Sequence, residues 1–259
     1  MPERPVTIQP ADARRRPEPE EIDINVVYED EWLIAINKPP GMVVHPTYRN
    51  WSGTLLNGLL WRVRDRAGIQ PSIITRLDKD TSGLVLVALS PEVHARMQRD
   101  GGAGRMKKEY LAIVRGTPDP PHGTIVEPLA RSTEDRRLVV VTPAGQHCET
   151  RYEVLRSWQG RPEGRSLHSP YSLVRCELVT GRTHQIRVHL AARGWPILGD
   201  ATYGEPHDAL TRQALHAWRL SVPHPGTQEL LHLEAPLPDD LAAFMPGHAE
   251  RSDAPMPSG

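Results

Sequence analysis

The 259-residue chain has little cysteine, no long apolar run and no excess of basic charge. Its two cysteines, Cys148 and Cys176, stand far apart, which excludes a disulfide framework and the paired spacing of a zinc site. No apolar run reaches the length that spans a bilayer, and the first residues lack the apolar core of a secretory signal. We therefore expect a cytoplasmic protein with reduced thiols and no membrane association.

The formal net charge is −1, so the chain lacks the overall basic balance that favours nucleic-acid binding. Basic residues nevertheless cluster at 105–108, 131–137 and 182–187, and acidic residues concentrate between 18 and 31. Such segregation permits a basic face on a nearly neutral protein, although any one cluster could equally be a solvated surface. Because the chain also lacks a phosphate-binding loop, a dinucleotide-binding glycine pattern and a metal-ligand cluster, we expect no cofactor and no metal.

Composition divides the chain into three parts. Residues 1–20 are rich in Pro, Glu and Arg without apolar periodicity, and we expect them and residues 247–259 to be disordered. The part between them, 21–246, shows no repeat and no long linker, so we expect a single domain.

Short apolar runs bounded by turn residues predict several strands. The predicted strands are 26–28 paired with 33–36, then 72–75, 84–89, 108–114, 138–141, 150–155 and 173–178. The predicted helices are 54–63 behind a Ser52 or Thr54 cap, a second from Ser90 to Gly101, and a third from a Thr183 cap to Arg193. Residues 158–171 are predicted to form a hairpin extension or a surface loop. Few βαβ patterns occur, so the predicted fold class is α+β, with a mixed, mainly antiparallel sheet flanked by helices.

The most informative connection is 76–83 (Arg-Leu-Asp-Lys-Asp-Thr-Ser-Gly), between two predicted buried strands. Flanking strands would hold a carboxylate there rigidly, as a catalytic site requires. The alternative is that Asp78 or Asp80 only shapes a turn, with Gly83 accepting a positive φ.

Three further segments occur in a fixed order around this connection. They are 36–46 (Ile-Asn-Lys-Pro-Pro-Gly-Met-Val-Val-His-Pro), 107–116 (Lys-Lys-Glu-Tyr-Leu-Ala-Ile-Val-Arg-Gly), and 180–189 (Thr-Gly-Arg-Thr-His-Gln-Ile-Arg-Val-His) followed by 196–200 (Pro-Ile-Leu-Gly-Asp). Together with 76–83 they resemble the motifs of the RluA family of RNA pseudouridine synthases, over about residues 24–236. One position departs from that pattern: Thr75 stands where the family usually has His, which affects fine positioning rather than the chemistry.

The resemblance implies an enzyme whose single catalytic domain isomerises a flipped-out uridine of structured RNA to pseudouridine. It implies Asp78 as the catalytic carboxylate, Arg187 as its ion-pair partner and Tyr110 against the flipped base. A guanidinium beside a buried carboxylate favours the ionised form, and its fork suits both carboxylate oxygens. Stacking on an aromatic ring offsets part of the cost of unstacking a base. The reaction is redox-neutral, which agrees with the absence of cofactor motifs.

We predict RNA contacts from Arg76, Lys108, Arg182, His184 and Gln185. Lys38 and His45 are weaker candidates for the RNA path. His184 and His189 lie five apart, a poor spacing for a shared metal, so they are interpreted as hydrogen-bonding or phosphate-facing residues. Asp80 and Asp200 are predicted to be turn or cap residues.

Several alternatives stay open at this level. Ribosomal RNA of the large subunit is the first expectation for the substrate and transfer RNA the second. A non-catalytic RNA-binding or ribosome-assembly factor could keep the same fold, and a glycoside hydrolase would need a second paired acid that the sequence does not show. Attack at the sugar and attack at the base ring are both compatible with the residues. We expect a monomer that needs no protein partner.

Overall fold

The computed structural model describes residues 16–47, 50–159 and 170–245. The strands are β1 (Val26–Glu29), β2 (Leu33–Lys38), β3 (Ser72–Ile73), β4 (Ser82–Ala88), β5 (Lys107–Arg115), β6 (His122–Val126), β7 (Leu129–Arg131), β8 (Val139–Val141), β9 (Glu149–Gln159), β10 (Pro170–Leu178), β11 (Leu215–Pro223) and β12 (Leu230–Glu234). The helices are α1 (Leu55–Arg62), α2 (Pro91–Gly102), α3 (Gln185–Ala192) and α4 (Asp239–Ala242).

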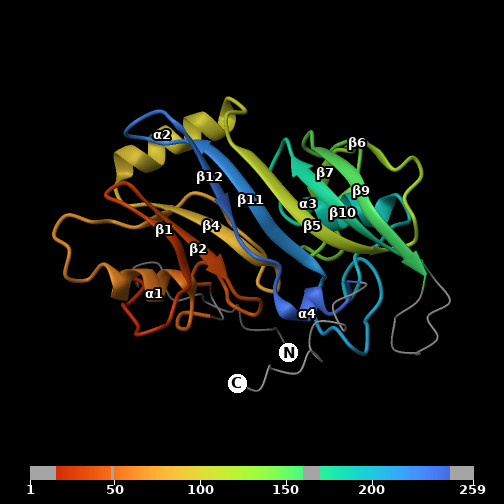
Figure 1. Ribbon diagram of the computed structural model, residues 1–259, viewed down its shortest axis with the longest axis horizontal. Helices are drawn as coiled ribbons and strands as arrows, with labels where there is room; N and C mark the ends of the chain where they lie inside the picture. Colours follow the sequence, from red (N-terminus) through yellow and green to blue (C-terminus); the bar gives the residue numbers. More distant parts are fainter. Residues whose placement is uncertain (1–15, 48–49, 160–169, 246–259) are drawn as a thin grey trace, which may run out of the picture.

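One large sheet runs through the molecule in the order β1-β2-β4-β11-β5-β10-β9-β6, with β3 beside β4 and β12 beside β11 (Figure 1). Within the described residues, β4 and β11 are the one parallel pair of this sheet, and its other pairs are antiparallel. The α+β class and the mixed, mainly antiparallel sheet are therefore confirmed.

Strand β4 is buried along its whole length because helices cover both of its faces. On one face Leu84 and Leu86 join the cluster that contains Met97 of α2. On the other face Val85 and Val87 join the cluster that contains Leu55 of α1. This alternation explains the unbroken apolar run in the sequence.

Local signals placed α1 and α2 correctly. Thr54 caps α1 in a reciprocal capping box with Asn57, and Ser90 caps α2 with Pro91 in the first turn. The predicted Thr183 cap of α3 is wrong, because His184 occupies the cap position with a left-handed φ of 55° and no side-chain cap bond. The conformation of one residue outside the helix thus decides where α3 begins.

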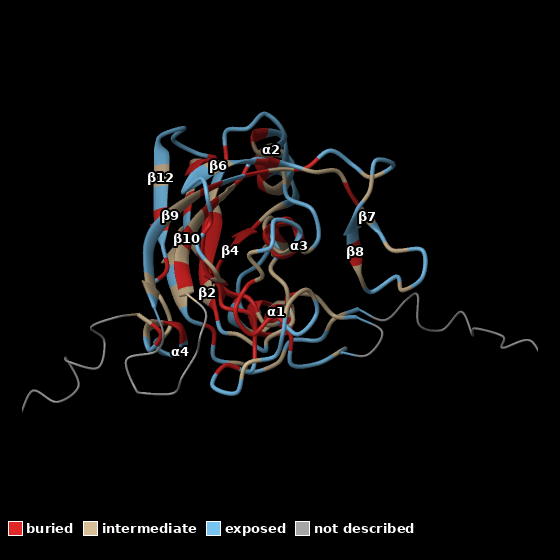
Figure 2. Ribbon diagram, turned by 90° about the vertical axis from the view of Figure 1, so that its right-hand side faces the viewer, coloured by how far each residue is buried: buried red, intermediate tan, exposed pale blue. Residues whose placement is uncertain are grey.

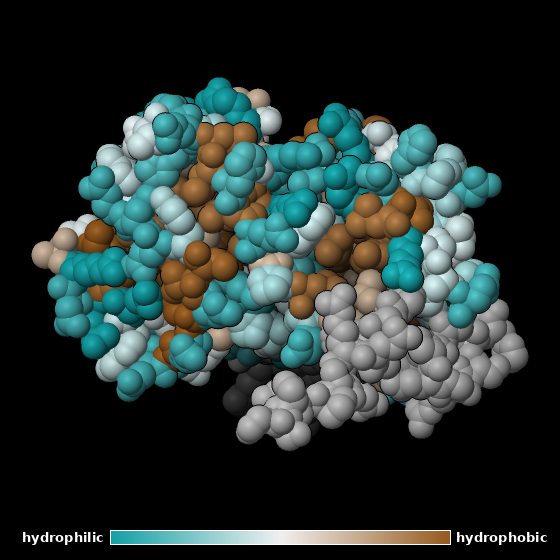
Figure 3. Space-filling view, in the orientation of Figure 1, coloured by the Kyte–Doolittle hydropathy of each residue, from teal (hydrophilic) through white to brown (hydrophobic). Residues whose placement is uncertain are grey.

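Helix α3 packs beside β5 and β10 through Ile186 and Leu190, and Val188 packs against the separate β7–β8 hairpin. Figure 2 shows α1 and α3 on one side of the large sheet, with the β7–β8 hairpin standing farther out on that side. The face that shows the strands in Figure 1 mixes hydrophilic and hydrophobic side chains (Figure 3). None of the helices in the described ranges is long and apolar enough to cross a membrane.

The predicted division of the chain lies near the ends of the described residues. The backbone N–H of Glu20 donates to the carbonyl of Asn57, and the Asn57 amide donates to the carbonyl of Glu18, so these two residues contact the predicted domain that starts at residue 21. Residues 1–15 and 246–259 lie outside the described residues, as does 160–169 within the predicted hairpin extension, whose flanking strands β9 and β10 pair up to Gln159 and Pro170.

Candidate active site

The connection 76–83 leads into β4, which begins beside β11 in the middle of the sheet. Gly83 has a φ of +108°, and a Cβ atom there would lie 2.2 Å from the carbonyl oxygen of Ala217. Only glycine fits this close backbone approach. The connection is therefore fixed at its C-terminal end by main-chain packing, and Gly83 has the positive φ that the turn alternative assigned to it.

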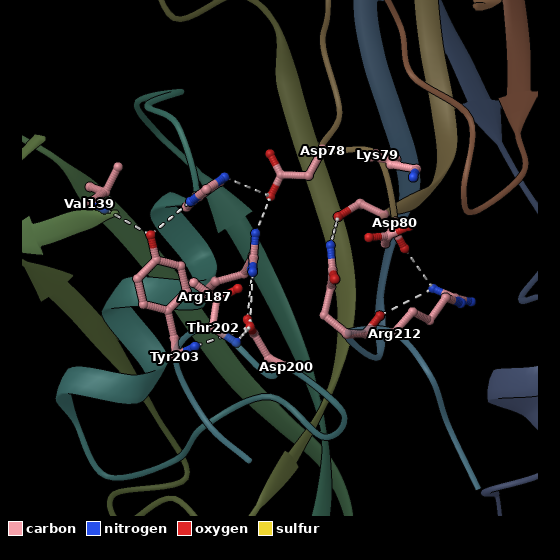
Figure 4. Close-up of polar contacts among 12 residues, drawn as sticks. Asp78, Lys79, Asp80, Val139, Arg187, Asp200, Thr202, Tyr203 and Arg212 are labelled. Atoms are coloured by element: carbon pink, nitrogen blue, oxygen red, sulfur yellow. Dashed lines mark hydrogen bonds and ion pairs between the residues drawn. The ribbon is translucent and has the colours of Figure 1, made fainter. Parts of the chain in front are cut away.

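Asp78 lies in an ion-pair chain with Arg187 of α3 and Asp200 (Figure 4). Arg187 donates from Nη1 to Asp78 Oδ2 at 2.9 Å, and from Nε and Nη2 to the two oxygens of Asp200 at 2.7 and 2.9 Å. The guanidinium is nearly buried, with 7% of its side chain exposed, whereas Asp78 keeps 25%. The predicted pairing of Asp78 with Arg187 is present, but the bidentate fork is directed at Asp200.

Asp200 combines the predicted turn role with this ion pair. Its Oδ1 also accepts hydrogen bonds from the backbone N–H groups of Thr202 and Tyr203. Burial raises the pKa of Asp200, but its bonds and charge interaction with Arg187 more than offset this, so the pKa lies below the ordinary value. The two carboxylates together hold the pKa of Arg187 above its ordinary value despite burial. Arg187 is therefore a permanent cation that fixes the position of Asp78.

Lys38, predicted as a weak RNA-path candidate, is instead fully buried beneath the connection. Its ammonium donates to the carbonyl oxygens of Pro39, Met42 and Lys79 at 2.7, 3.0 and 2.9 Å, which uses all three donors. Burial lowers the pKa of Lys38 to about 7, against the opposing charge of Asp80. Because three carbonyls match three donors, we interpret the group as an ammonium that ties Lys79 to the 39–42 turn.

Arg212 holds the other side of the connection. It donates from Nη1 to the carbonyl oxygen of Asp80 at 3.3 Å (Figure 4), while Nε and Nη2 bind Asp240. The amide of Gln213 donates to Thr81 Oγ1 at 3.1 Å. Asp78 is thus carried by a connection that is anchored on both flanks.

Tyr110 lies on β5 with its side chain almost buried in the cluster that Leu77 also contacts. Burial raises the pKa of Tyr110, and the nearby charge of Asp78 raises it further. The hydroxyl is therefore protonated at neutral pH. Among the described residues the Tyr110 hydroxyl has no hydrogen-bond partner, and Tyr110 is not one of the residues that line the pocket beside Asp78.

His184 and Tyr203 complete the rim of the site. Nδ1 of His184 lies 2.7 Å from the Tyr203 hydroxyl, and that oxygen accepts a hydrogen bond from the backbone N–H of Val139 at 2.9 Å. Nε2 of His184 lies 3.8 Å from Asp78 Oδ2. Arg187 lies over the Tyr203 ring, with 5.0 Å from Cζ to the ring centroid.

These side chains surround a polar pocket of about 290 Å³ lined by Asp78, Lys79, Asp80, His184, Arg187, Gly199, Asp200, Ala201, Thr202, Thr211, Arg212 and Gln213. Asp78 Oδ1 has no hydrogen-bond partner among the described residues, so one carboxylate oxygen is available to a ligand. No group of three or more His, Cys, Asp or Glu side chains suited to a metal occurs in the described part of the chain.

The predicted RNA-contacting residues divide into two groups. Arg76 and Arg182 are exposed, and Lys108 is half-buried beside Gly181, with its ammonium 3.2 Å from where a Cβ of Gly181 would lie. Gln185 is different: it is 2% exposed, and its amide binds the Thr180 hydroxyl, the backbone N–H of Arg182, the carbonyl of Glu149 and the hydroxyl of Thr150. The predicted RNA contact of Gln185 is therefore wrong, because its hydrogen-bonding groups are used inside the protein to shape the 180–184 loop.

His189 and Thr75 also use their side chains in hydrogen bonds inside the protein. His189 is buried and binds the hydroxyl of Thr150 and the carbonyl of Glu127, so it is a hydrogen-bonding residue of the interior. Thr75, at the position where the resemblance predicts His, accepts a hydrogen bond from the backbone N–H of Leu86 through its hydroxyl. Thr75 thus joins the connection to β4.

The sequence did not reveal the structural role of Lys38 or the places of Tyr203, Arg212 and Gln213 in the site. Lys38 carried a usable signal, because it ends a buried strand and precedes a Pro-Pro-Gly turn whose carbonyls need donors. Tyr203, Arg212 and Gln213 carried none that a single sequence reveals, since they reach the site from a loop and from the segment before β11.

Comparison with known proteins gives consistent matches. Residues 32–192 match the family model described as RNA pseudouridylate synthase. An uncharacterized RNA pseudouridine synthase of Bacillus subtilis is 40% identical over 242 residues, which cover 88% of this chain and 76% of the relative. Ribosomal large subunit pseudouridine synthase D of Nitrosomonas europaea is 40% identical over 236 residues, which cover 87% of this chain and 65% of the relative.

Two solved human structures are similar over most of their length. "RNA Pseudouridylate Synthase Domain Containing 1" has a TM-score of 0.68 at 26% identity. The match covers 91% of this chain and 97% of the human chain. "RNA Pseudouridylate Synthase Domain Containing 4" has a TM-score of 0.66 at 25% identity, and the match covers 85% of this chain and 91% of the human chain.

Proposed function

The chain belongs to the RNA pseudouridylate synthase family, and we propose that it converts uridines of large-subunit ribosomal RNA to pseudouridine, with Asp78 as the catalytic carboxylate. The observation that carries this proposal is the Asp78–Arg187–Asp200 chain at the edge of an open polar pocket. Asp78 keeps one free oxygen there, while a buried guanidinium fixes the other. A carboxylate held in this way can act on a nucleoside without any cofactor.

The chemistry requires a carboxylate that faces the sugar or the base of an extruded uridine. Breaking the glycosidic bond at N1 and remaking it at C5 transfers neither electrons nor phosphate. Asp78 Oδ1 is the group available to the reacting nucleoside, and Oδ2 stays bound to Arg187. Arg187 positions Asp78 in this proposal and does not act on the substrate, because each of its three side-chain nitrogens donates to one of the two carboxylates.

Tyr110 is proposed to contact the flipped base. Its side chain comes from β5, near enough to Asp78 for that charge to raise its pKa, and the raised pKa keeps the hydroxyl protonated at neutral pH. A protonated phenol suits stacking and hydrogen-bond donation, and it does not suit a general base that acts alone. We therefore assign Tyr110 to base positioning rather than to removal of the C5 proton.

RNA as the substrate is supported by the charge near the pocket. Lys79 lines the pocket and is exposed, and Arg76 and Arg182 are exposed two positions before Asp78 and His184 along the chain. The β7–β8 hairpin carries the exposed residues Arg131 and Arg136. These cations offer contacts to phosphates on the side of the sheet that holds α3. Ribosomal RNA is preferred to transfer RNA because curated relatives are named ribosomal large subunit pseudouridine synthases.

The test is pseudouridine formation by the purified protein on unmodified transcripts of large-subunit ribosomal RNA and of transfer RNAs. We expect modified positions in the ribosomal transcript, read by sequencing after pseudouridine-specific chemistry. Modification of transfer RNA alone would correct the substrate. Tight binding to either RNA without any modification would instead indicate a non-catalytic RNA-binding factor.

A further inference from the structure

The hydrogen bonds around Tyr203 favour one of the two neutral tautomers of His184. The Tyr203 oxygen accepts from the backbone N–H of Val139, and His184 Nδ1 is the described acceptor within reach of the tyrosine's own hydrogen, at 2.7 Å. If the phenol donates to Nδ1, the neutral ring carries its hydrogen on Nε2. The ring is neutral at neutral pH because burial lowers the pKa of His184, against the charge of Asp78 and with that of Arg187.

Nε2–H of His184 is then a donor without a partner. The nearest acceptor is Asp78 Oδ2, but 3.8 Å separates the two atoms, which is beyond a hydrogen bond. Both residues line the pocket. A hydroxyl oxygen placed about 2.8 Å from each could accept from the imidazole and donate to the carboxylate.

On the basis of the proposed function, we propose that His184 and Asp78 together bind the ribose 2′-hydroxyl of the target uridine. His184 Nε2–H donates to the hydroxyl oxygen, and the hydroxyl donates to Asp78 Oδ2. The 2′-hydroxyl is both donor and acceptor, and it is the group by which a protein distinguishes RNA from DNA. His184 thus acts as a specificity-determining residue, and Tyr203 acts as a positioning residue through it.

The backbone supports this placement. His184 has a left-handed φ of 55°, an unusual conformation for a residue other than glycine. Buried contacts of the next residue, Gln185, hold the loop in that shape. The imidazole is 21% exposed, so it is fixed at the pocket wall yet open to a ligand.

The test uses one synthetic RNA stem-loop that the wild-type protein modifies, made with either ribose or 2′-deoxyribose at the target nucleotide. We expect the wild type to bind the ribose form about three- to tenfold more tightly in fluorescence anisotropy, as one hydrogen-bonded group would give. His184→Gly keeps the left-handed backbone free of strain and removes the imidazole. We expect it to bind the ribose form more weakly and the deoxy form within twofold of wild type.

Gln228→Gly is the matched control, because Gln228 is the other described non-glycine residue with positive φ, at 66°, and it does not line the pocket. We expect this variant to keep the wild-type preference for ribose. Tyr203→Phe removes only the phenol oxygen and is expected to reduce the preference partly. In ¹⁵N spectra of the free protein, the His184 signal, assigned by its loss in His184→Gly, is expected to show protonated Nε2 and bare Nδ1.

The inference would be overturned if an active wild type bound the two RNAs with equal affinity. It would also be overturned if His184→Gly lost affinity for both RNAs equally. A proton on Nδ1 would do the same. Failure of the wild type to modify any RNA would be a separate result, since it removes the proposed function and is read before either variant is compared.

Discussion

Replacing Arg187 with lysine perturbs the centre of the site while the positive charge is kept. Arg187 makes three charge-assisted hydrogen bonds, two to Asp200 and one to Asp78. Lysine offers one nitrogen, which cannot occupy the three donor positions of the planar fork. Loss of two such bonds would cost about 3–6 kcal/mol. Because Asp200 keeps two backbone donors, we expect the lower end, about 3 kcal/mol, for the decrease in the free energy of unfolding.

The same variant should lose activity, because Asp78 would no longer be held at one position. A displacement of about 1 Å at a reacting group can cost about 100-fold in rate. Urea denaturation at pH 7 measures the stability, and single-turnover pseudouridine formation measures the rate. Arg219→Lys is the matched control, since Arg219 pairs with Glu234 at an exposed site; we expect a change within about 0.5 kcal/mol. An Arg187→Lys protein as stable as this control, with near-normal turnover, would refute the positioning role.

Three further predictions concern the scaffold. Gly83→Ala should decrease the free energy of unfolding by at least about 3 kcal/mol, because the new Cβ would meet the Ala217 carbonyl. Gly41→Ala is the control and should cost about 1 kcal/mol, because a Cβ there has open space. Equal urea midpoints for the two variants would contradict this prediction. Lys38→Met should decrease the free energy of unfolding by about 3 kcal/mol and reduce pseudouridine formation, because the carbonyls of Pro39, Met42 and Lys79 lose their donor. Unchanged stability and rate would contradict the role of Lys38 in holding Lys79 to the 39–42 turn. Burial lowers the pKa of His189 and of His216 from 6.5, so below that pH the unfolded chain binds more protons than the folded chain. The free energy of unfolding should therefore decrease from pH 7.5 to 5.5 by up to about 1 kcal/mol for each histidine. Equal or greater stability at pH 5.5 would contradict this.

Local sequence signals predicted the elements whose burial pattern is simple. Thr54 and Ser90 carry cap signals, and the apolar run after Gly83 marks a strand covered on both faces. Strand β11 was not predicted, although it lies at the centre of the sheet. The apolar pattern of β11 is interrupted by His216, Trp218 and Arg219. Its first part pairs with β4 and its second part with β12, so its side chains meet different surroundings along the strand.

The site was predictable only where a motif carried it. The pairing of Asp78 with Arg187 joins residues 109 positions apart and followed from the resemblance, not from local pattern. The first six residues of α3, Gln185–Leu190, are all buried, so no polar face in the sequence distinguished Gln185, which is used inside, from a residue available to RNA. Hydrogen-bond satisfaction, which depends on the folded chain, decides between those roles.

The most direct measurement of the central claim is tritium release from C5-labelled uridine in ribosomal RNA by wild-type protein and by Asp78→Asn. Asparagine keeps the size of the side chain and removes the charged carboxylate. We expect the wild type to release tritium, and Asp78→Asn to release none while its affinity for the RNA stays within about threefold. Release by Asp78→Asn at a rate close to wild type would contradict the assignment of Asp78 as the catalytic carboxylate.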